Sequence, residues 1–564
     1  MNKYFNSAII GNSKILACLN EKAELIRLYY PYIDYFQNID IYSLGFAREN
    51  KVYWFKDATL INQYYDGNII HTKLSYNDTE ILIRDYILIN ENLMIRKIKY
   101  NQPTSTLIYS KLKSTPDKLI SGMCIDNSLI QYAQDLYMAT FSNSKIIKAQ
   151  INNVQDVLEN ANLRLEDYIG MSDSSAIMLE EKKEVTIYIL LKSNLKETIK
   201  KIEYYRKQNE EDLYQEVKKY WREFLEKHLN YYIGEKKFSN KEIDIIERTI
   251  YLFSILSNKE TGAVLAAPDV DEDFTKCGRY GYCWPRDALF INEAMSLLGM
   301  QDLVKKFYSV WAEKTQLKNG LFEQRYYSNG ELAPSWGIQI DETASMVIGI
   351  SKLENKKEYK KIVEKAVIGM FSFLDENFLS KNCFDLWEER KGSHLYSICA
   401  IYKALEEARD ILKDFSEDNH LICEIDLLQP KILDAIINNF IENGIFKRSL
   451  DNNLPDISIL SVLYPFEILD ISDERITRTV EYIERELKLS NGGYLRYKDD
   501  NYMGGNAWII SSLWLSIYYI KKRDIEKAKE LYNFVTNHSD SKGFLPEQID
   551  RDSGKTAWIT ELSW

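Results

Sequence analysis

Two glutamates that lie far apart in the sequence have the setting that a pair of catalytic carboxylates needs. Glu388 follows Trp387 in the loop FDLWEERKGS, and Glu547 lies in the loop GFLPEQID. Hydrolysis of a glycosidic bond uses one carboxylic acid to protonate the leaving oxygen and one carboxylate to activate water or to attack the sugar. An apolar ring such as that of Trp387 can raise the pKa of the acid. For Glu388 taken alone, a solvated glutamate at a helix start is the simpler interpretation, because the helix dipole favours it there.

A second loop, YGYCWPRD, ends in two charged residues at the start of an apolar segment. The guanidinium of Arg286 and the carboxylate of Asp287 could together hold adjacent sugar hydroxyls through charge-assisted hydrogen bonds. Because Pro285 stands just before them, Asp287 could equally be ordinary helix-start chemistry. The sequence leaves both interpretations open.

Two more loops carry acidic, basic and aromatic side chains. The loop FEQRYYSNGELAPSWGIQID offers Trp336, Gln339 and Asp341, although Asp341 could be only a helix cap. Flat aromatic rings stack on the apolar faces of sugars, but most of the 40 Tyr, 22 Phe and 10 Trp are expected in the core. The loop GGYLRYKDDNYMGGNAW carries Arg496, Tyr502 and Trp508.

The first part of the chain is expected to be β-structure. To about residue 193 it consists of short alternating segments, such as KVYWF, IIHTKLSY, TEILIRDYILI and EVTIYILLK, separated by polar breaks. A period of two is typical of antiparallel strands, and about a dozen of them predict a β-sandwich over residues 1–193. The period then becomes helical, and two charged amphipathic segments predict a helical linker over residues 194–239.

From residue 240 the hydrophobic period stays helical, which predicts a helical domain over residues 240–564. Short connections alternate with long loops among about twelve helices, so we expect a double ring of helical hairpins, an (α/α)6 barrel. Apolar segments such as TASMVIGI should form the inner ring, and the long loops should meet on one rim. The last helix should begin after Thr560 and be cut short. Expected helices include residues 286–299, 301–316, 341–354, 456–470 and 506–522.

Composition and charge argue against several kinds of partner. The 564 residues carry a formal net charge of −12 with scattered basic residues, so we expect no nucleic-acid partner. No apolar run reaches the length of a membrane span, and the N-terminal segment lacks a core typical of a signal peptide. We therefore expect a cytoplasmic protein with no membrane partner, while the oligomeric state stays open.

The sequence predicts no cofactor and no metal site. The seven cysteines show no CxxC spacing, and none of the five histidines lies within ligand spacing of another. The acidic run at residues 269–273 could hold a structural calcium, but a solvated surface is the simpler interpretation.

The motifs YGYCWPRD, WGIQIDE, DLWEER and LPEQ, in this order and at these separations, resemble glycoside hydrolase family 15. That family contains glucoamylases, glucodextranases and related trehalases. The segments IIGNSKILACLN and LYYPYIDYFQN resemble the start of its prokaryotic members, so the resemblance spans nearly the whole chain. It implies a β-sandwich, a helical linker and an (α/α)6 barrel.

The resemblance also implies roles for individual residues. Glu388 would be the general acid, Glu547 the general base, and Glu389 a ligand of the sugar in the next subsite. Family members invert the anomeric centre, so a water must fit between the two carboxyl groups, and we expect a separation of roughly 6.5 to 9.5 Å. The residues expected to bind the terminal glucose or to form its pocket are Arg286, Asp287, Tyr280, Trp284, Trp336 and Trp387, with Asp341 as a further candidate.

Together with these patterns, the resemblance implies an inverting, exo-acting α-glucosidase that releases glucose from the non-reducing ends of malto- or isomaltooligosaccharides. A trehalase with the same chemistry is the first alternative, because the sequence does not fix the subsite beyond the scissile bond. A non-catalytic carbohydrate-binding relative and a phosphorylase on a similar barrel are the others. The loop FKRSLDNNLPD matches the family poorly, and its Arg448 is a weak candidate for a sugar contact.

Overall fold

The chain divides into two compact units. The computed structural model describes residues 5–34, 36–49, 51–115, 118–152, 154, 169–415 and 419–562. The first unit consists of residues 1–231, 250–258 and 268–277, and the second of residues 232–249, 259–267 and 278–564. Within the described residues, no helix is both long and apolar enough to cross a membrane.

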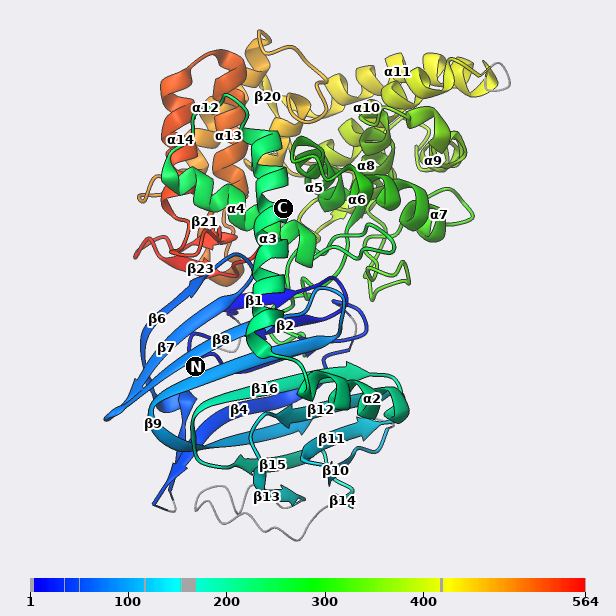
Figure 1. The fold of residues 1–564 in the computed structure, drawn as a ribbon. Coiled ribbons are helices and arrows are strands. Elements are labelled where there is room, and N and C mark those ends of the chain that lie inside the picture. The colour runs from blue at the N-terminus through cyan, green and yellow to red at the C-terminus, as the bar shows by residue number, and fades with distance from the viewer. Residues whose placement is uncertain are drawn as a thin grey trace. The chain divides into compact units, whose positions relative to one another are not determined.

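The first unit is an antiparallel β-sandwich (Figure 1). Its longest strand, β9 (Leu93–Leu112), belongs to both layers. On one side it pairs with β8 (Thr79–Ile87) and β16 (Lys182–Lys192), and further along it pairs with β4 (Ile39–Arg48) and β15 (Ser174–Leu179). One long strand therefore passes from one sheet to the other and joins the two layers.

The remaining strands extend these layers or form a small sheet of their own. Strands β1 (Ala8–Gly11), β2 (Leu16–Leu19) and β3 (Leu25–Tyr29) make a separate three-stranded sheet. The others are β5 (Lys51–Trp54), β6 (Thr59–Tyr65), β7 (Ile70–Tyr76), β10 (Ser121–Ile125), β11 (Ser128–Ala133), β12 (Leu136–Ser142), β13 (Ile146–Ile151) and β14 (Ile169–Gly170).

One hydrophobic cluster fills the space between the layers. It combines residues of one sheet, such as Ile83 and Ile187, with residues of the other, such as Leu44 and Ile177. Along β8, buried side chains alternate with exposed ones over the first four residues, because successive side chains of a strand point to opposite faces. This alternation is the period of two in the sequence, and the predicted β-sandwich is confirmed.

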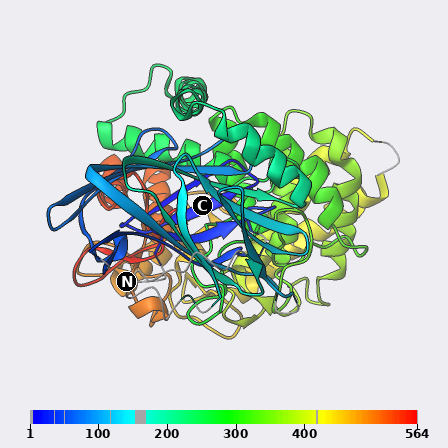
Figure 2. The ribbon, with the colours of Figure 1, turned by 60° about the horizontal axis from the view of Figure 1, so that its bottom comes forward.

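Two helices follow the sandwich in the first unit, in the segment predicted to be helical. The side chain of Asn194 caps α2 (Leu195–Arg206) by accepting a hydrogen bond from the backbone N–H of Glu197. The helix packs on β12 and β16. The next helix, α3 (Glu210–Ile233), is a straight rod that is seen from the side in Figure 1 and nearly end-on in Figure 2.

The second unit is a barrel of paired helices, as the sequence predicts (Figure 1). Its inner helices are α5 (Pro285–Leu297), α8 (Ile340–Ser351), α10 (Leu395–Leu412) and α13 (Ile509–Lys522). α5 contacts α8, α8 contacts α10, and the short 3₁₀-helix η5 (Ile457–Val462) contacts both α10 and α13. All but one residue of α8 is buried, which explains its apolar sequence.

Most inner elements have an outer partner that follows or precedes them in the chain. α6 (Gln301–Lys306) packs on α5, α9 (Lys360–Ser372) on α8, and α11 (Asn419–Asn439) on α10. Likewise, α12 (Glu474–Leu487) packs on η5 and α14 (Ile525–Asn537) on α13. Further elements of this unit are the short 3₁₀-helix η3 (Lys356–Tyr359) and strands β19 (Ile441–Glu442) and β20 (Ile445–Phe446). Helix α4 (Asn240–Ile255) begins in the second unit, and its last residues belong to the first.

Three expected helices differ from their predicted ranges. The segment 301–316 is not one helix but α6, a π-helical segment (Phe307–Trp311) and α7 (Ala312–Thr315). In the segment 456–470 only η5 is helical, because Pro465 has no N–H to donate and disfavours a helical residue before it. The residues 559–562 are irregular, and Glu561 has a φ of 63°, so the expected helix does not begin within the described residues there.

Candidate active site

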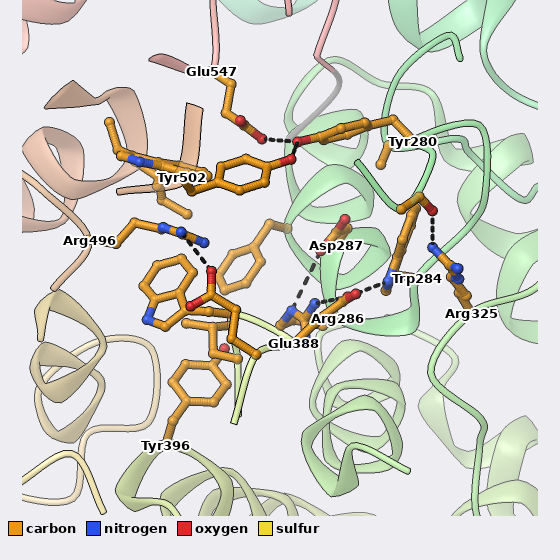
Figure 3. A pocket seen from close by; sticks show the side chains of 18 of the residues that line it. Tyr280, Trp284, Arg286, Asp287, Arg325, Glu388, Tyr396, Arg496, Tyr502 and Glu547 are labelled. Carbon is orange, nitrogen blue, oxygen red and sulfur yellow. Dashed lines mark hydrogen bonds and ion pairs between the residues drawn. The ribbon is translucent and has the colours of Figure 1, made fainter. Parts of the chain in front are cut away.

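A cavity of about 490 Å³ lies in the second unit, among the loops that precede the inner helices (Figure 3). Nine of the ten residues predicted as site residues line it, and Asp341 does not. The nine are Tyr280, Trp284, Arg286, Asp287, Trp336, Trp387, Glu388, Glu389 and Glu547.

Glu388 lies in the loop between β17 (Cys383–Phe384) and β18 (Lys391–Gly392). Its φ is 64°, a conformation that costs a non-glycine residue about 1 kcal/mol or more and that clusters at functional sites. The indole Nε1 of Trp284 donates a hydrogen bond of 2.7 Å to Oε1 of Glu388, and Nη2 of Arg286 lies 3.5 Å from the same oxygen. Burial raises the pKa of Glu388, while the charge of Arg286 opposes that rise.

The position of Glu388 also decides between the two interpretations of this glutamate. The next helix, α10, begins only at Leu395, and its N-cap residue is His394. Glu388 is therefore not a helix-start residue, and that alternative is wrong.

Glu547 directly precedes β22 (Gln548–Ile549), which pairs with β21 (Ala507–Trp508) and β23 (Thr556–Trp558). Its Oε1 accepts a hydrogen bond of 2.9 Å from the Tyr280 hydroxyl, and its Oε2 accepts one of 2.9 Å from Nε2 of Gln548. Only 2% of the residue is exposed, and this burial raises the pKa of Glu547 to about 7. The two hydrogen bonds limit the rise, because they stabilise the ionised form.

The two carboxylates reach the same cavity from loops far apart in the sequence (Figure 3). In the close-up, Glu547 lies beside Tyr280 and Tyr502, whose hydroxyls are 3.2 Å apart, and Glu388 lies beside Trp284. The cavity thus presents two acids with raised pKa values and different hydrogen-bond partners, Glu547 buried and Glu388 partly buried. Such an arrangement is suited to acid–base chemistry.

Arg286 lies in the first turn of α5 with four carboxylates around its guanidinium. Nη1 is 3.0 Å from Oδ2 of Asp341 and 3.0 Å from Oε1 of Glu342. Nη2 is 3.5 Å from Glu388, and Nε is 3.6 Å from Asp287. Burial raises the pKa of Asp287 to about 7 and that of Glu342 well above its usual value. The charge of Arg286 lowers both pKa values, but it only partly offsets the effect of burial.

Asp341 supports the site from behind the cavity wall. It is fully buried and pairs with Arg286. It is not a helix cap, because the N-cap position of α8 is held by Gln339, which makes no side-chain capping hydrogen bond. Instead, Nε2 of Gln339 donates a hydrogen bond of 2.6 Å to the backbone carbonyl of Asp385.

The carboxylate of Glu389 is held by Arg496 and Tyr497. Nη2 of Arg496 donates a hydrogen bond of 2.9 Å to Oε1, and the Tyr497 hydroxyl donates to Oε2. Asp500 accepts two further hydrogen bonds from the same guanidinium, at 2.9 and 3.0 Å. The guanidinium carbon lies 4.2 Å from the ring centre of Trp508, and Glu389, Arg496 and Trp508 all line the cavity.

Tryptophan rings form much of the cavity wall. Trp336 is 43% exposed, and the guanidinium carbon of Arg325 lies 4.4 Å from its ring centre. The rings of Trp387 and Trp508 are 6.2 Å apart and tilted. Flat rings beside convergent polar groups suit the binding of a sugar, which has apolar faces and polar edges.

Several residues around the cavity were not singled out from the sequence. Glu342 follows Asp341 in the motif WGIQIDE, where an acidic pair resembles ordinary first-turn chemistry. Arg325 lines the cavity from a long loop without any motif. Arg448 does not line the cavity, and its Nη1 lies 3.7 Å from a carboxylate oxygen of Asp456.

The acidic run of the first unit binds its own backbone. The carboxylate of Asp271 accepts hydrogen bonds from the backbone N–H groups of Lys276 and Cys277, at 2.6 and 2.9 Å. Although burial alone would raise it, these bonds lower the pKa of Asp271 to about 2. Over the described ranges, no group of three or more His, Cys, Asp or Glu side chains is arranged to hold a metal ion.

Comparisons with known proteins cover both units. An uncharacterized glycosyl hydrolase of Methanocaldococcus jannaschii is 27% identical over 99% of this chain and 97% of its own length. Trehalase 2 of Sulfolobus acidocaldarius is 22% identical over 54% of this chain and 59% of its own length. A solved structure of a bacterial glucoamylase complexed with acarbose shares the fold, with a TM-score of 0.82 over 99% of this chain and 92% of its own, at 17% identity.

A family model gives the assignment. The model described as glycosyl hydrolases family 15 matches residues 244–529, just over half of the 564 residues. The matched segment contains the loops of Arg286, Asp341, Glu388 and Arg496. This chain belongs to the glycosyl hydrolases of family 15.

Proposed function

We propose that this chain hydrolyses α-linked gluco-oligosaccharides from their non-reducing ends with inversion of the anomeric configuration. The observation that carries the proposal is the pair of carboxylates with raised pKa values, Glu388 and Glu547, on one cavity that also presents Arg286 and Asp287. Membership of family 15 supports hydrolysis of a glycosidic bond. The acarbose bound to the glucoamylase of similar fold supports the sugar class.

Glu388 acts as the general acid. Burial raises its pKa, which favours the protonated carboxyl, and the hydrogen bond from Trp284 to Oε1 leaves Oε2 to carry the proton toward the leaving oxygen. After the transfer, the nearby charge of Arg286 stabilises the carboxylate that remains. Trp284 therefore orients the protonated acid, and Arg286 stabilises the carboxylate that forms when the proton has left.

Glu547 acts as the general base. The hydrogen bonds from Tyr280 and Gln548 fix both carboxylate oxygens, so the group can take a proton from a water with little reorganisation. The water attacks the anomeric carbon from the side opposite the leaving oxygen, which requires a separation of roughly 6.5 to 9.5 Å between the carboxyl groups.

Recognition of the sugars falls to the charged residues around the acid. Arg286 and Asp287 bind hydroxyls of the terminal glucose, and Glu389, held by Arg496, binds the next sugar. Asp341 acts through Arg286, because it does not line the cavity and its carboxylate holds the guanidinium.

Product analysis tests the reaction. Purified protein is incubated separately with maltotriose, isomaltotriose and trehalose, with and without phosphate, and glucose is measured. The proposal expects glucose from a maltooligosaccharide or isomaltooligosaccharide, and proton NMR should show the β-anomer first because the enzyme inverts. Initial α-glucose would contradict inversion, strict dependence on phosphate would indicate a phosphorylase, and no glucose from any substrate would contradict hydrolysis.

Substitution of the two carboxylates tests their roles. Glu388→Gln and Glu547→Gln should each lower kcat by about 10² to 10⁴-fold, because each removes one proton-transfer group. Acarbose binding, measured by calorimetry, should persist in both variants. Glu481→Gln, on the exposed face of α12, is the matched control and should keep full activity. Undiminished hydrolysis by Glu547→Gln would refute the base assignment.

A trehalase is the second candidate, because one of the similar proteins is named a trehalase. Both reactions use the same acid and base and differ in the sugar held beyond the scissile bond. The ratio of kcat/KM for trehalose to that for maltose decides between them. A ratio above about ten, or roughly 1.4 kcal/mol of discrimination, would select the trehalase.

A further inference from the structure

A buried carboxylate behind the cavity wall holds one of the wall's tryptophans. The indole Nε1 of Trp387 lies 3.1 Å from both Oδ1 and Oδ2 of Asp456 and donates to both. Asp456 is 1% exposed and does not line the cavity, whereas Trp387 does. A hydrogen bond to a carboxylate is stronger than one to a neutral acceptor, so this contact fixes the orientation of the indole.

Asp456 is itself fixed by its surroundings. It is the N-cap residue of η5, and its Oδ1 also accepts a hydrogen bond of 2.8 Å from the backbone N–H of Ser458. Nη1 of Arg448 lies 3.7 Å from its Oδ2. Since the backbone of η5 sets the position of the carboxylate, the indole takes its position from a rigid element rather than from its own loop.

Asp456 also ties the Trp387 loop to the loop of Arg496 and Tyr497, whose side chains bind the carboxylate of Glu389. The backbone of Asp456 forms a β-bridge with Tyr497. The N–H of the next residue, Ile457, donates a hydrogen bond of 2.7 Å to the carbonyl of Arg496. The guanidinium carbon of Arg496 lies 5.2 Å from the ring centre of Trp387. Three loops therefore meet at Asp456, and the wall beside the acid depends on it.

We propose that Asp456 is a positioning residue of this site, which fixes the indole of Trp387 as the wall beside Glu388 and thereby the sugar that packs on it. The inference rests on the proposed function. Without the anchor the ring can turn into the cavity and weaken substrate binding. Glu388 keeps its own partners, Trp284 and Arg286, so the chemical step should change little.

The test is a double-mutant cycle of Asp456→Asn and Trp387→Phe. Asparagine is a good N-cap residue of the same shape, so the start of η5 is preserved, but its amide nitrogen cannot accept the second indole bond. We expect KM to rise about tenfold in Asp456→Asn and kcat to stay within about threefold, because the lost interaction supports binding in ground and transition states alike. Trp387→Phe should also raise KM. The KM of the double variant should not exceed that of the single variant with the higher KM.

Asp473→Asn is the matched control. Asp473 is also an N-cap aspartate of the second unit, and its carboxylate accepts a hydrogen bond of 2.9 Å from the backbone N–H of Arg475 at the start of α12. Its replacement makes the same chemical change at a helix start without touching the cavity wall. KM should stay as in the wild type.

Several outcomes overturn the proposal. They are an unchanged KM in Asp456→Asn, an equal rise in Asp473→Asn, or additive effects of Asp456→Asn and Trp387→Phe. Should Asp456→Asn not fold, Trp387→Phe alone decides, because an unchanged KM in that variant would refute the anchor. If the wild type releases no glucose, the proposed function fails, and the anchor is then tested by the same cycle in urea unfolding, where additivity would refute it.

Discussion

The pKa values of two carboxylates decide at which pH this cavity can work. Glu388 lies 3.5 Å from the guanidinium of Arg286, whereas the two hydrogen bonds to Glu547 come from a tyrosine hydroxyl and an amide. Burial raises the pKa of Glu547 to about 7, and its hydrogen bonds from Tyr280 and Gln548 limit that rise. In its proposed role as general base Glu547 must be ionised, so kcat/KM should fall about tenfold per pH unit below about 7.

The hydroxyl of Tyr280 should set the position of that acidic limb. Its hydrogen bond stabilises the ionised form of Glu547, and its loss should raise the pKa of Glu547 further. In Tyr280→Phe we expect the acidic limb of the kcat/KM profile to move to higher pH by about half a unit to one unit. The measurement is the pH dependence of kcat/KM for both proteins on the best substrate.

The control for this prediction is another tyrosine that donates to a glutamate. The Tyr532 hydroxyl donates a hydrogen bond of 2.8 Å to Oε1 of Glu242 on the surface of the second unit. Tyr532→Phe should leave the profile unchanged. A limb that stays in place or moves to lower pH in Tyr280→Phe would show that Glu547 is not the group that must be ionised.

At the scale of elements, the starts of two neighbouring inner helices are joined through one residue. Arg286 is in the first turn of α5, and Glu342 is in the first turn of α8. Oε2 of Glu342 accepts a hydrogen bond of 2.5 Å from the backbone N–H of Arg286, and its Oε1 lies 3.0 Å from the guanidinium. The first N–H groups of a helix lack partners within it, and the helix dipole favours a carboxylate there. Glu342 therefore acts as a clamp on Arg286: it accepts a hydrogen bond from the first turn of α5 and holds the guanidinium at the cavity.

Arg286→Met should destabilise the second unit strongly. The change leaves Asp341, Glu342 and Asp287 without their shared cation in a buried place. Breaking such a buried cluster costs about 3 to 5 kcal/mol, and the loss should shrink toward pH 4 as Asp287 and Glu342 take up protons. Urea unfolding at pH 7 and pH 4, followed by tryptophan fluorescence, measures both values.

Arg478→Met supplies the comparison. Arg478 pairs with Glu474 at 2.9 Å on the surface of α12, where both side chains are largely exposed. This substitution should cost less than about 1 kcal/mol at either pH. An equal cost for the two arginines, or a cost for Arg286→Met that does not depend on pH, would contradict the clamp.

At the scale of the whole molecule, the buried acids of the site cost stability at neutral pH. Burial raises the pKa of Glu547 from 4.5 to about 7 and that of Asp287 from 3.8 to about 7. An acid whose pKa is raised by folding stabilises the folded state fully at a pH below its unfolded value, and this contribution is lost as the pH rises through the folded value. Between about pH 4 and pH 7 the ionisation of these two acids thus lowers the free energy of unfolding of the chain.

Glu547→Gln should therefore be more stable than the wild type at high pH. A neutral amide pays no ionisation cost, so its advantage should grow from pH 4 to pH 8 by about 3 kcal/mol. Urea unfolding of both proteins at several pH values gives the difference. Glu481→Gln, on the exposed face of α12, should show no such trend. A difference that stays constant with pH would mean that Glu547 titrates alike in the folded and unfolded chain.

The sequence by itself determined the classes of the elements and most of the loops that meet at the cavity. The alternating strands up to Lys192 and the helical period after Asn240 are local patterns, since each follows from which face of an element is buried. The loop motifs identified nine residues that line one cavity, because a barrel of paired helices brings its long loops to one rim.

Only the tertiary structure decided what lies behind that rim. Asp341 faces Arg286 instead of the cavity, Glu342 clamps α5, and Asp456 holds the indole of Trp387. No local pattern reveals these contacts, because each joins loops or helices that are distant in sequence, and the same acidic residues at a helix start are usually only caps or first-turn charges. Which side chains line the cavity and which hold those side chains in place depends on the packing of the helices, and that is a property of the folded chain.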